Sequence, residues 1–321
     1  MSVKPFLSVV CPVYNERESV PLLVDELYQV LQRLTADRIR DFEIIFVDDG
    51  STDGTADVLE RLRGERPRLG VIRFRINVGK SAGLARGFRA SVGDVVITLD
   101  GDLQDDPREI PALLDKLDEG YHVVSGWKAD RKDPLSKRVP SRLYNWATRT
   151  ASGLPLHDFN CGLKAYRREV LDDIRVYGQL HRFLPVLAHW RGFRVDEIRV
   201  RHRPRRYGRS KFGASRFVAG LLDFMTVVFL MKYRRRPLHL FGLIGLVLFG
   251  IGILVNVYLA LVWLQTHAIG GRPLLIFGLL STILGFQFVS IGLLGEMMVH
   301  LLKSEDDAPV ESSLAPRGDE Q

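Results

Sequence analysis

The sequence has few cysteines and no hydrophobic leader at its start. Its two cysteines, Cys11 and Cys161, lack the close spacing of thiol ligands around a metal. They indicate reduced thiols in a cytoplasmic domain. Residues 1–16 contain one lysine and then an alternating, strand-like run, without the long apolar core and small-residue cleavage site of a secretory signal. We therefore expect the N-terminal part of the chain to stay inside the cell.

A missing glycine excludes a nucleotide-binding loop that residues 77–83 would otherwise suggest. The run NVGKSAG contains Gly-Lys-Ser, but a Walker loop needs a glycine five residues earlier, and Phe74 stands there. We therefore reject a P-loop nucleotide triphosphatase. Two interpretations of Lys80 remain. The glycines permit a tight helix start whose amides and Lys80 bind an anion, or Lys80 is a solvated surface charge.

Charge is distributed unevenly along the 321 residues. The formal net charge is +7, but residues 304–321 hold six acids and one arginine, a net of −5, which leaves +12 on residues 1–303. A basic body indicates phosphate-bearing partners, such as a membrane surface, nucleotides or nucleic acid. The acidic tail, which also contains Pro and Ser, is predicted to be disordered.

Apolar strand-like runs alternate with amphipathic helices from Phe6 to about Leu114. This order predicts an α/β fold with a mostly parallel sheet and helices on both faces. The expected strands are 7–12, 42–47, 69–74 and 94–99, and the expected helices are 18–34, 54–63 and 79–92. Ligands of such sheets bind beyond the carboxyl ends of the strands. Three of the four ends carry polar clusters, which we expect to share one cleft: Tyr14, Asn15 and Glu16; Asp48, Asp49, Gly50 and Ser51; and the acids after Leu99.

The strongest of these clusters is the acidic run at residues 100–106. Asp100 and Asp102 lie on either side of Gly101, which suits a turn whose oxygens converge on a hard divalent ion and leave positions for water and a substrate phosphate. The alternative is an acidic loop that ends a strand and caps a helix beginning at Pro107, a role that fits Asp106. We favour metal ligands for Asp100 and Asp102, because like charges this close are costly without a cation.

The middle of the chain offers less decisive features. A short strand is expected at 121–125, and residues 137–150 predict a basic helix with one apolar stripe, which either packs on the domain or lies on an anionic membrane. Asp158 and Asn160 precede a glycine turn, and Asp158 is either a turn-forming side chain or a carboxylate of the catalytic centre. An alternating strand at 193–203 leads into a basic loop, which is an anion-binding loop or a juxtamembrane patch.

Two long uncharged runs dominate the last third of the sequence. Leu238–Leu264 has 27 residues, about 40 Å as a helix, and Leu274–Gly295 has 22, so both are predicted to span a membrane. Basic residues flank the pair, and the connection holds only Arg272, so the positive-inside rule puts both ends in the cytoplasm. Phe217–Met231 is shorter and contains an acid, so we expect an interfacial helix there.

Taken together, six features resemble glycosyltransferase family 2 enzymes of the polyprenyl-phosphate class. The sequence is similar to bacterial bactoprenol (undecaprenyl-phosphate) glucosyltransferases and, more distantly, to dolichol-phosphate mannose synthase. Each feature alone is weak, whereas the combination is specific. The features are PVYNE at 12–16, VDDGSTDGT at 47–55, DGDLQDDP at 100–107, HDFNCGLKAYRR at 157–168, RRYGRSKFG at 205–213, and the terminal apolar hairpin.

The resemblance implies an organisation and an activity. It implies a cytoplasmic GT-A domain, Rossmann-like with a mostly parallel sheet, at 1–212, then an interfacial helix and basic segment at 213–236, a two-helix transmembrane hairpin at 237–303 and an acidic tail at 304–321. The expected enzyme moves a hexose, with UDP-glucose favoured as donor, to a polyprenyl phosphate at the cytoplasmic face of the inner membrane. It also implies self-assembly, consistent with Gly242, Gly245, Gly250 and Gly252 in the first span, and no nucleic-acid partner.

The resemblance also implies roles for individual residues. The nucleoside would lie among Pro12, Tyr14, Asn15, Glu16 and Asp49, with Asp48 nearby. A Mg²⁺ or Mn²⁺ ion on the donor diphosphate would lie among Asp100, Asp102 and Gln104. Lys128 stands where relatives often have Arg, which keeps the charge but loses bidentate phosphate binding. Residues matching positions associated with donor or acceptor phosphate are Arg131, Arg206, Ser210 and Lys211.

The chemistry narrows what these residues have to do. Glycosyl transfer with inversion needs a nucleophile opposite a stabilised leaving group. A lipid phosphate, with a second pKa near about 6, is mostly ionised at neutral pH and needs no strong base. We therefore expect the metal, Arg206 and Lys211 to offset the charge of the leaving group. Asp158 is expected to position the acceptor or an arginine rather than remove a proton.

Three alternatives stand beside this activity, one with the same chemistry and two of another kind. The same chemistry with GDP-mannose or another UDP-sugar uses the same residues. A processive polysaccharide synthase usually carries a Gln-x-x-Arg-Trp motif and more spans, and neither occurs here. A non-catalytic membrane adaptor with a decayed nucleotide fold conflicts with the intact Asp100 and Asp102.

Overall fold

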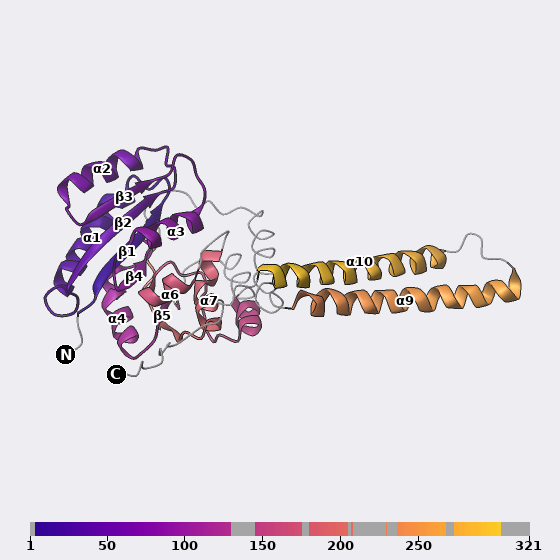
Figure 1. Cartoon of the computed structure of the whole chain (residues 1–321). Helices are drawn as coiled ribbons and strands as arrows, with labels where there is room; N and C mark the ends of the chain where they lie inside the picture. Colours follow the sequence, from indigo (N-terminus) through magenta and orange to yellow (C-terminus); the bar gives the residue numbers. More distant parts are fainter. Residues whose placement is uncertain are drawn as a thin grey trace, which may run out of the picture. The chain divides into compact units, whose positions relative to one another are not determined.

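The computed structural model describes residues 4–129, 145–174, 180–204, 207, 229, 236–267 and 273–302. The chain divides into two compact units, Met1–Asp223 and Phe224–Gln321. The first unit holds a seven-stranded sheet and the second holds two long apolar helices (Figure 1). The finer domain boundaries expected at 212, 236 and 303 remain predictions.

The first unit alternates strands and helices as the periodicity predicts. Its strands are β1 (Phe6–Val13), β2 (Asp41–Asp48), β3 (Leu69–Arg73), β4 (Val95–Thr98), β5 (Val123–Trp127), β6 (Lys164–Arg167) and β7 (Val195–Arg199). Its helices are α1 (Ser19–Leu34), α2 (Thr55–Glu65), α3 (Lys80–Ala90), α4 (Ile110–Asp118), α6 (Arg168–Asp173) and α7 (Leu184–Trp190), with 3₁₀ turns η1 (Pro107–Glu109) and η2 (Leu180–Phe183). The strands and helices expected before residue 100 all occur, within two residues of their predicted ends.

Strand β6 departs from the expected pattern. The sheet order is β3-β2-β1-β4-β6-β5-β7, and β6 runs antiparallel to both β4 and β5. The sequence predicted a turn and a helix start here. A strand of four residues directly before α6 is too short to show a recognisable alternation of apolar and polar residues. The reversal puts the beginning of β6 where β4 ends: Lys164 is in register with Thr98, whose hydroxyl donates to the carbonyl of Gly162 at 2.8 Å.

Two apolar cores cover the two faces of the sheet. Successive strand side chains point to opposite faces, so Val9 and Ile97 pack in one core with α1, α2 and α4, whereas Val10 and Val96 pack in the other with α3, α6 and α7. This helix–sheet–helix layering confirms the predicted α/β class. It leaves the strand ends, where the polar clusters lie, as the edge free to bind a ligand.

The second unit is a helical hairpin. Helices α9 (Pro237–Thr266) and α10 (Pro273–Leu302) lie side by side (Figure 1). Both are long and apolar enough to cross a membrane, with mean hydropathies of 2.5 and 2.1. Their glycines form the contact between them: a Cβ on Gly245 would lie 2.7 Å from the carbonyl oxygen of Gly285. Part of the glycine pattern expected to serve self-assembly thus packs within one chain.

A glycine replacement on α10 should separate the two helices. A Cβ on Gly285 would lie 2.4 Å from the backbone nitrogen of Phe249, which cannot rotate away. Gly285→Ala is therefore expected to lower the unfolding temperature of the detergent-solubilised protein by several degrees. Gly250→Ala is the matched control, because no atom lies within 4 Å of the added carbon. Equal unfolding temperatures for the two variants would contradict this packing.

Two predicted membrane-surface elements fall largely outside the described residues. The interfacial helix at 213–236 is one, and most of the basic helix at 137–150 is the other. Residues 145–152 are helical, and Trp146 is 64% exposed. Its role at a membrane surface stays a prediction.

Candidate active site

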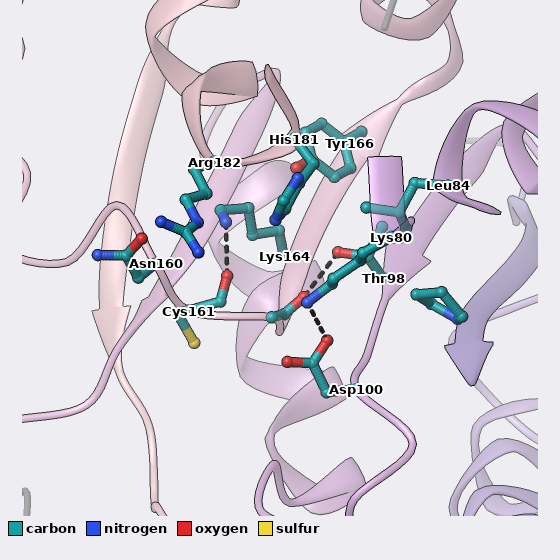
Figure 2. A pocket seen from close by; sticks show the side chains of 12 residues that line it. Lys80, Leu84, Thr98, Asp100, Asn160, Cys161, Lys164, Tyr166, His181 and Arg182 are labelled. Carbon is teal, nitrogen blue, oxygen red and sulfur yellow. Dashed lines mark hydrogen bonds and ion pairs between the residues drawn. The ribbon is translucent and has the colours of Figure 1, made fainter. Parts of the chain in front are cut away.

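Asp100 follows β4 and pairs with Lys80, the first residue of α3 (Figure 2). The two side chains are 30% and 34% exposed, so the pair lies at the mouth of the site. Burial alone would raise the pKa of Asp100, but Lys80 and Lys128 outweigh it and lower the pKa to about 2. Asp100 is therefore a carboxylate at any physiological pH, and Lys80 is a site cation rather than a free surface charge.

The turn after Asp100 is held in a strained shape. Leu103 has a φ of 61°, in the left-handed region that a side chain other than glycine adopts at a cost of about 1–2 kcal/mol. Its side chain is 3% exposed and packs in the core with α1 and α4, which offsets that cost. The turn leaves Asp102 partly exposed, with its carboxylate accepting from the amide of Gln104 at 3.2 Å.

Asp100 and Asp102, two of the three predicted metal ligands, suit a divalent cation. A Cβ on Gly162 would lie 2.5–2.6 Å from the carboxylate of Asp100, so the glycine preserves space beside it. Magnesium commonly binds through one or two carboxylates, with substrate phosphates and water completing its shell. Among the described residues no group of three or more His, Cys, Asp or Glu side chains is placed to hold a metal. Asp100 and Asp102 therefore fit an ion that reaches the site with a phosphate.

The side chain of Gln104 contacts the segment that follows β7. Its amide nitrogen lies 3.4 Å from the Nε2 atom of His202 and 3.5 Å from the carbonyl oxygen of Arg203. The segment after β7 thereby orients the amide. A role for Gln104 beside a metal stays a prediction.

The second half of the acidic run has structural partners. Asp105 pairs with Lys128 at 2.7 Å, and their side chains are 0% and 10% exposed. Asp106 accepts from the amide of Arg108 at 3.0 Å, which makes it the N-cap of η1, and it pairs with Arg203 at 2.6 Å. The expected helix-capping role of Asp106 is confirmed. Only the first half of the run is left to face a ligand.

Lys128, predicted to bind phosphate, thus forms an ion pair with the carboxylate of Asp105. Burial would lower its pKa, but Asp105 and Asp100 outweigh burial and raise it, so Lys128 stays charged. Its charge is neutralised within the protein. Phosphate binding by Lys128 would have to compete with Asp105.

The loops after β1 and β2 hold one another in place. The carbonyl oxygen of the Asn15 side chain accepts from the amide of Thr52 at 2.8 Å, and the amide of Asn15 donates to Ser51 Oγ at 2.9 Å. Asn15 itself has a φ of 55°. The amide of Glu16 donates to Thr55 Oγ1 at 3.0 Å. The predicted nucleoside-binding residues therefore lie on one cross-linked edge, together with the partly exposed Pro12 and Tyr14.

The two aspartates at the end of β2, Asp48 and Asp49, are buried and bind backbone amides. Asp48 is 0% exposed and accepts from the amide of Ser51 at 3.1 Å. Asp49 is 4% exposed and accepts from the amides of Val78 and Gly79 at 2.7 and 2.8 Å. Asp49 therefore clamps the loop that delivers Lys80 to Asp100. The sequence predicted contact with the nucleoside, and the structure adds this positioning role.

The loop before β6 brings Asp158 to the same edge. Asp158 is 2% exposed and accepts from the amide of Asn160 at 3.0 Å, the turn-forming bond that the sequence offered as one alternative. The loop is anchored at His157, whose amide and ring both contact Glu197. Cys161 is buried and free, and burial raises the pKa of its thiol to about 12, so it is a neutral thiol.

A cavity beside Asp100 is lined by residues that the sequence analysis missed (Figure 2). Lys164 begins β6, and His181 and Arg182 lie on η2. Ser81 Oγ and the Nδ1 atom of His181 are 2.6 Å apart, which ties η2 to α3. Lys164 gave one signal: it is the charged residue in an otherwise apolar run, Leu-Lys-Ala-Tyr. Four predicted phosphate ligands lie outside the described residues: Arg131, Arg206, Ser210 and Lys211.

The half-buried His181 predicts a pH-dependent stability. Burial and the nearby cations Lys80 and Arg182 lower the pKa of His181 from 6.5 to about 2. Below pH 6.5 the unfolded chain takes up a proton that the folded chain does not, so stability falls as pH drops. The loss attributable to His181 is about 1 kcal/mol between pH 7 and 5.5. His181→Asn should flatten the denaturation-based stability profile over this range by that amount, and parallel profiles for variant and wild type would contradict the assignment.

Comparisons with known proteins agree with this arrangement. Residues 8–175 match the family model described as glycosyl transferase family 2. A dodecaprenyl-phosphate galacturonate synthase of Rhizobium johnstonii is 34% identical over 309 residues, 94% of this chain and 90% of that protein. An undecaprenyl-phosphate 4-deoxy-4-formamido-L-arabinose transferase of Pseudomonas syringae pv. syringae is 36% identical over 297 residues, 91% of this chain and 85% of that protein.

Solved structures share the fold of the first unit. Glucosyl-3-phosphoglycerate synthase from Mycobacterium tuberculosis, in complex with phosphoglyceric acid, has a TM-score of 0.54 at 21% identity and covers 70% of this chain and 79% of its own. The same enzyme crystallised with Mn²⁺, UDP-glucose and phosphoglyceric acid has a TM-score of 0.52 at 21% identity, covering 69% and 80%. The GT-A fold that the motifs implied is confirmed. With a family model matching over half of its residues and relatives aligned over nine tenths, the chain belongs to glycosyl transferase family 2 and is a glycosyltransferase.

Proposed function

We propose that the chain transfers a hexose from a nucleotide sugar to a polyprenyl phosphate at the cytoplasmic face of the inner membrane. The observation that carries the proposal is the pair Asp100 and Asp102 at the end of β4, beside Lys80, in a chain whose relatives are named for polyprenyl-phosphate sugar transfer. The two apolar helices α9 and α10 support a membrane location for the lipid acceptor.

Asp100 and Asp102 are the residues we assign to a Mg²⁺ or Mn²⁺ ion, with Gln104 as a further candidate. When bound, the ion supplies charge neutralisation to the departing nucleoside diphosphate. Lys80 contributes a second positive charge at the same place, delivered by the Asp49 clamp. The first expected consequence is that transfer requires a divalent cation and stops with a chelator.

The remaining residues bind and orient the two substrates. The cross-linked loops after β1 and β2 would hold the nucleoside, with Asn15 and Asp49 fixing their shape. Asp158, held by its own turn, is assigned to orienting the acceptor phosphate or an arginine. An ionised phosphate needs no strong base for an inverting attack, so Asp158 is assigned positioning rather than proton removal.

The sugar is the least constrained part of the proposal. The motif resemblance favours UDP-glucose, whereas the curated relatives are named for galacturonate and formamido-arabinose. A panel of donors decides the matter: UDP-glucose, UDP-galacturonate, UDP-galactose and GDP-mannose, each radiolabelled, with purified full-length protein, undecaprenyl phosphate and Mn²⁺. We expect labelled lipid with one donor and none with chelator. Release of free sugar alone, or no lipid product with any donor, would overturn the proposal.

The membrane topology and the self-association expected from the sequence are proposals of the same kind. Both ends of the hairpin are expected in the cytoplasm, with residues 265–273 outside. A reporter enzyme active only outside the cytoplasm should give signal when inserted at position 269 and none when fused after position 303. The reverse pattern would exclude the proposed orientation. Crosslinking of the full-length protein in membranes tests self-association.

A further inference from the structure

We propose that Lys164 and Arg182 bind an oxyanion of a substrate, either a carboxylate on the donor sugar or the phosphate of the lipid acceptor. The inference rests on the proposed function and deepens it, because it assigns a charged-group subsite beside the Asp100 and Asp102 pair. Both sources present the same chemistry, a negatively charged oxygen that accepts charge-assisted hydrogen bonds.

The first observation is the burial of Lys164. Its side chain begins β6 and the residue is 4% exposed. An ammonium has three N–H donors, and two of them bind the carbonyl oxygens of Phe159, at 3.3 Å, and Cys161. Among the residues described, no carboxylate forms an ion pair with Lys164. Burying a charge without a carboxylate partner costs free energy. If this side chain served only to bind the two carbonyl oxygens, a neutral hydrogen-bond donor would do so at a lower free-energy cost than the ammonium of Lys164.

The second observation is the excess of positive charge in the same cavity. Figure 2 shows the side chain of Lys164 between those of Arg182 and His181. The cavity contains one carboxylate, Asp100, and that carboxylate pairs with Lys80. Arg182 likewise forms no ion pair with a described carboxylate. Two cations are left over, which is the charge pattern of an anion site that awaits its ligand.

The third observation is the size and position of the cavity. Its volume is about 10 Å³, room for about one water-sized group. This space fits one oxygen of a carboxylate or phosphate rather than a whole sugar ring. The cavity opens beside Asp100, so an oxyanion there would belong to a group next to the donor diphosphate. His181, neutral and bonded to Ser81, forms a wall without adding charge.

The test compares Lys164→Met with Lys164→Arg in the full-length detergent-solubilised protein. Methionine keeps the length and removes the charge, and arginine keeps the charge. Without ligand, we expect Lys164→Met to fold but to unfold at a lower temperature than the wild type, because the carbonyl oxygens of Phe159 and Cys161 lose their donor. A residue that serves only the fold would show the same loss, so the binding measurements below decide between the two roles. Lys4→Met is the control for losing one lysine, because Lys4 is exposed and its ammonium donates only to the carbonyl oxygen of Ala36 among the contacts described.

Two pairs of probes identify the source of the oxyanion. Titration calorimetry with UDP-glucuronate against UDP-glucose tests a sugar carboxylate, and undecaprenyl phosphate against undecaprenol tests the acceptor. We expect the wild type to prefer the charged member of one pair at least about 10-fold. Lys164→Met should lose that preference, Lys164→Arg should keep most of it, and UDP alone should bind all variants equally.

Three results would overturn the assignment. The first is a wild type that shows no preference in either pair, and the second is an unchanged preference in Lys164→Met. The third is a loss of UDP affinity in Lys164→Met as large as its loss of affinity for the charged probe. If Lys164→Met fails to fold, Arg182→Met on the partly exposed η2 repeats the same comparison and decides it. Because these are binding measurements, they hold even if no donor supports sugar transfer, so failure of the proposed function is seen separately.

Discussion

Asp102→Asn is expected to reduce sugar transfer at least about 1,000-fold while the protein folds and enters the membrane normally. The reason is electrostatic. Asp102 is one of two carboxylates assigned to the ion, and removing a charge that stabilises a developing negative charge costs several kcal/mol in such sites. Its contact with the amide of Gln104 can be kept by the asparagine oxygen. The measurement is initial rates of labelled lipid formation over a Mn²⁺ titration.

The control for this experiment lies on α4. Asp118 is 70% exposed and pairs with Arg38 at the surface, so Asp118→Asn removes the same charge far from the site. It should leave both the rate and the Mn²⁺ dependence unchanged. Wild-type turnover by Asp102→Asn with an unchanged Mn²⁺ dependence would show that Asp102 does not serve the metal, and equal losses in both variants would point to net charge instead.

Lys128→Met is expected to produce the largest loss of stability in the catalytic unit. Removing one partner of a buried ion pair leaves the other charge unpaired and typically costs 3–5 kcal/mol. Asp105 is fully buried, and Lys128 is its partner at 2.7 Å. For a domain of about 200 residues this corresponds to a decrease of roughly 10 °C in the unfolding temperature. The measurement is thermal unfolding of the solubilised protein without substrates.

A double variant separates this role from phosphate binding. Lys128→Met combined with Asp105→Asn removes both charges and should recover much of the stability lost in the single variants. If Lys128 instead bound the donor phosphate, the single variant would unfold near the wild-type temperature and show a raised KM for the donor. Lys4→Met, at an exposed lysine whose ammonium donates to the carbonyl oxygen of Ala36 at 3.1 Å, should change stability by less than about 1 kcal/mol.

The local pattern of the sequence was enough to predict the sheet and the edge where the site lies. Short apolar runs identify β1, β2 and β4 because these strands are largely buried between the two cores, and the polar residues that follow mark the strand ends. Asp106 before Pro107 identified a helix cap because capping is a contact within three residues.

The parts that were missed depend on pairing between distant residues. Nothing near Asp105 reveals that Lys128 neutralises it, and nothing near Asp49 reveals its bonds to Val78 and Gly79, because those partners meet only in the folded sheet. Strand β6 was missed because it has only four residues and starts with a buried lysine, a residue that is usually exposed. The same lysine then proved to line the site.

The reversed strand β6 also fixes when the site can form during folding. Asp100 and Gly162 are neighbours only because β6 pairs with β4, a contact that closes a loop of more than sixty residues. The pairing of Leu7 with Val95 between β1 and β4 closes a still longer loop, so the site forms only after the loop-closure entropy of both pairings has been overcome. A chain that has completed only β1 to β4 therefore holds the acidic turn but lacks the wall that completes the site. Donor binding should consequently appear together with the final closure of the sheet, and a bound donor would stabilise the whole unit rather than one loop.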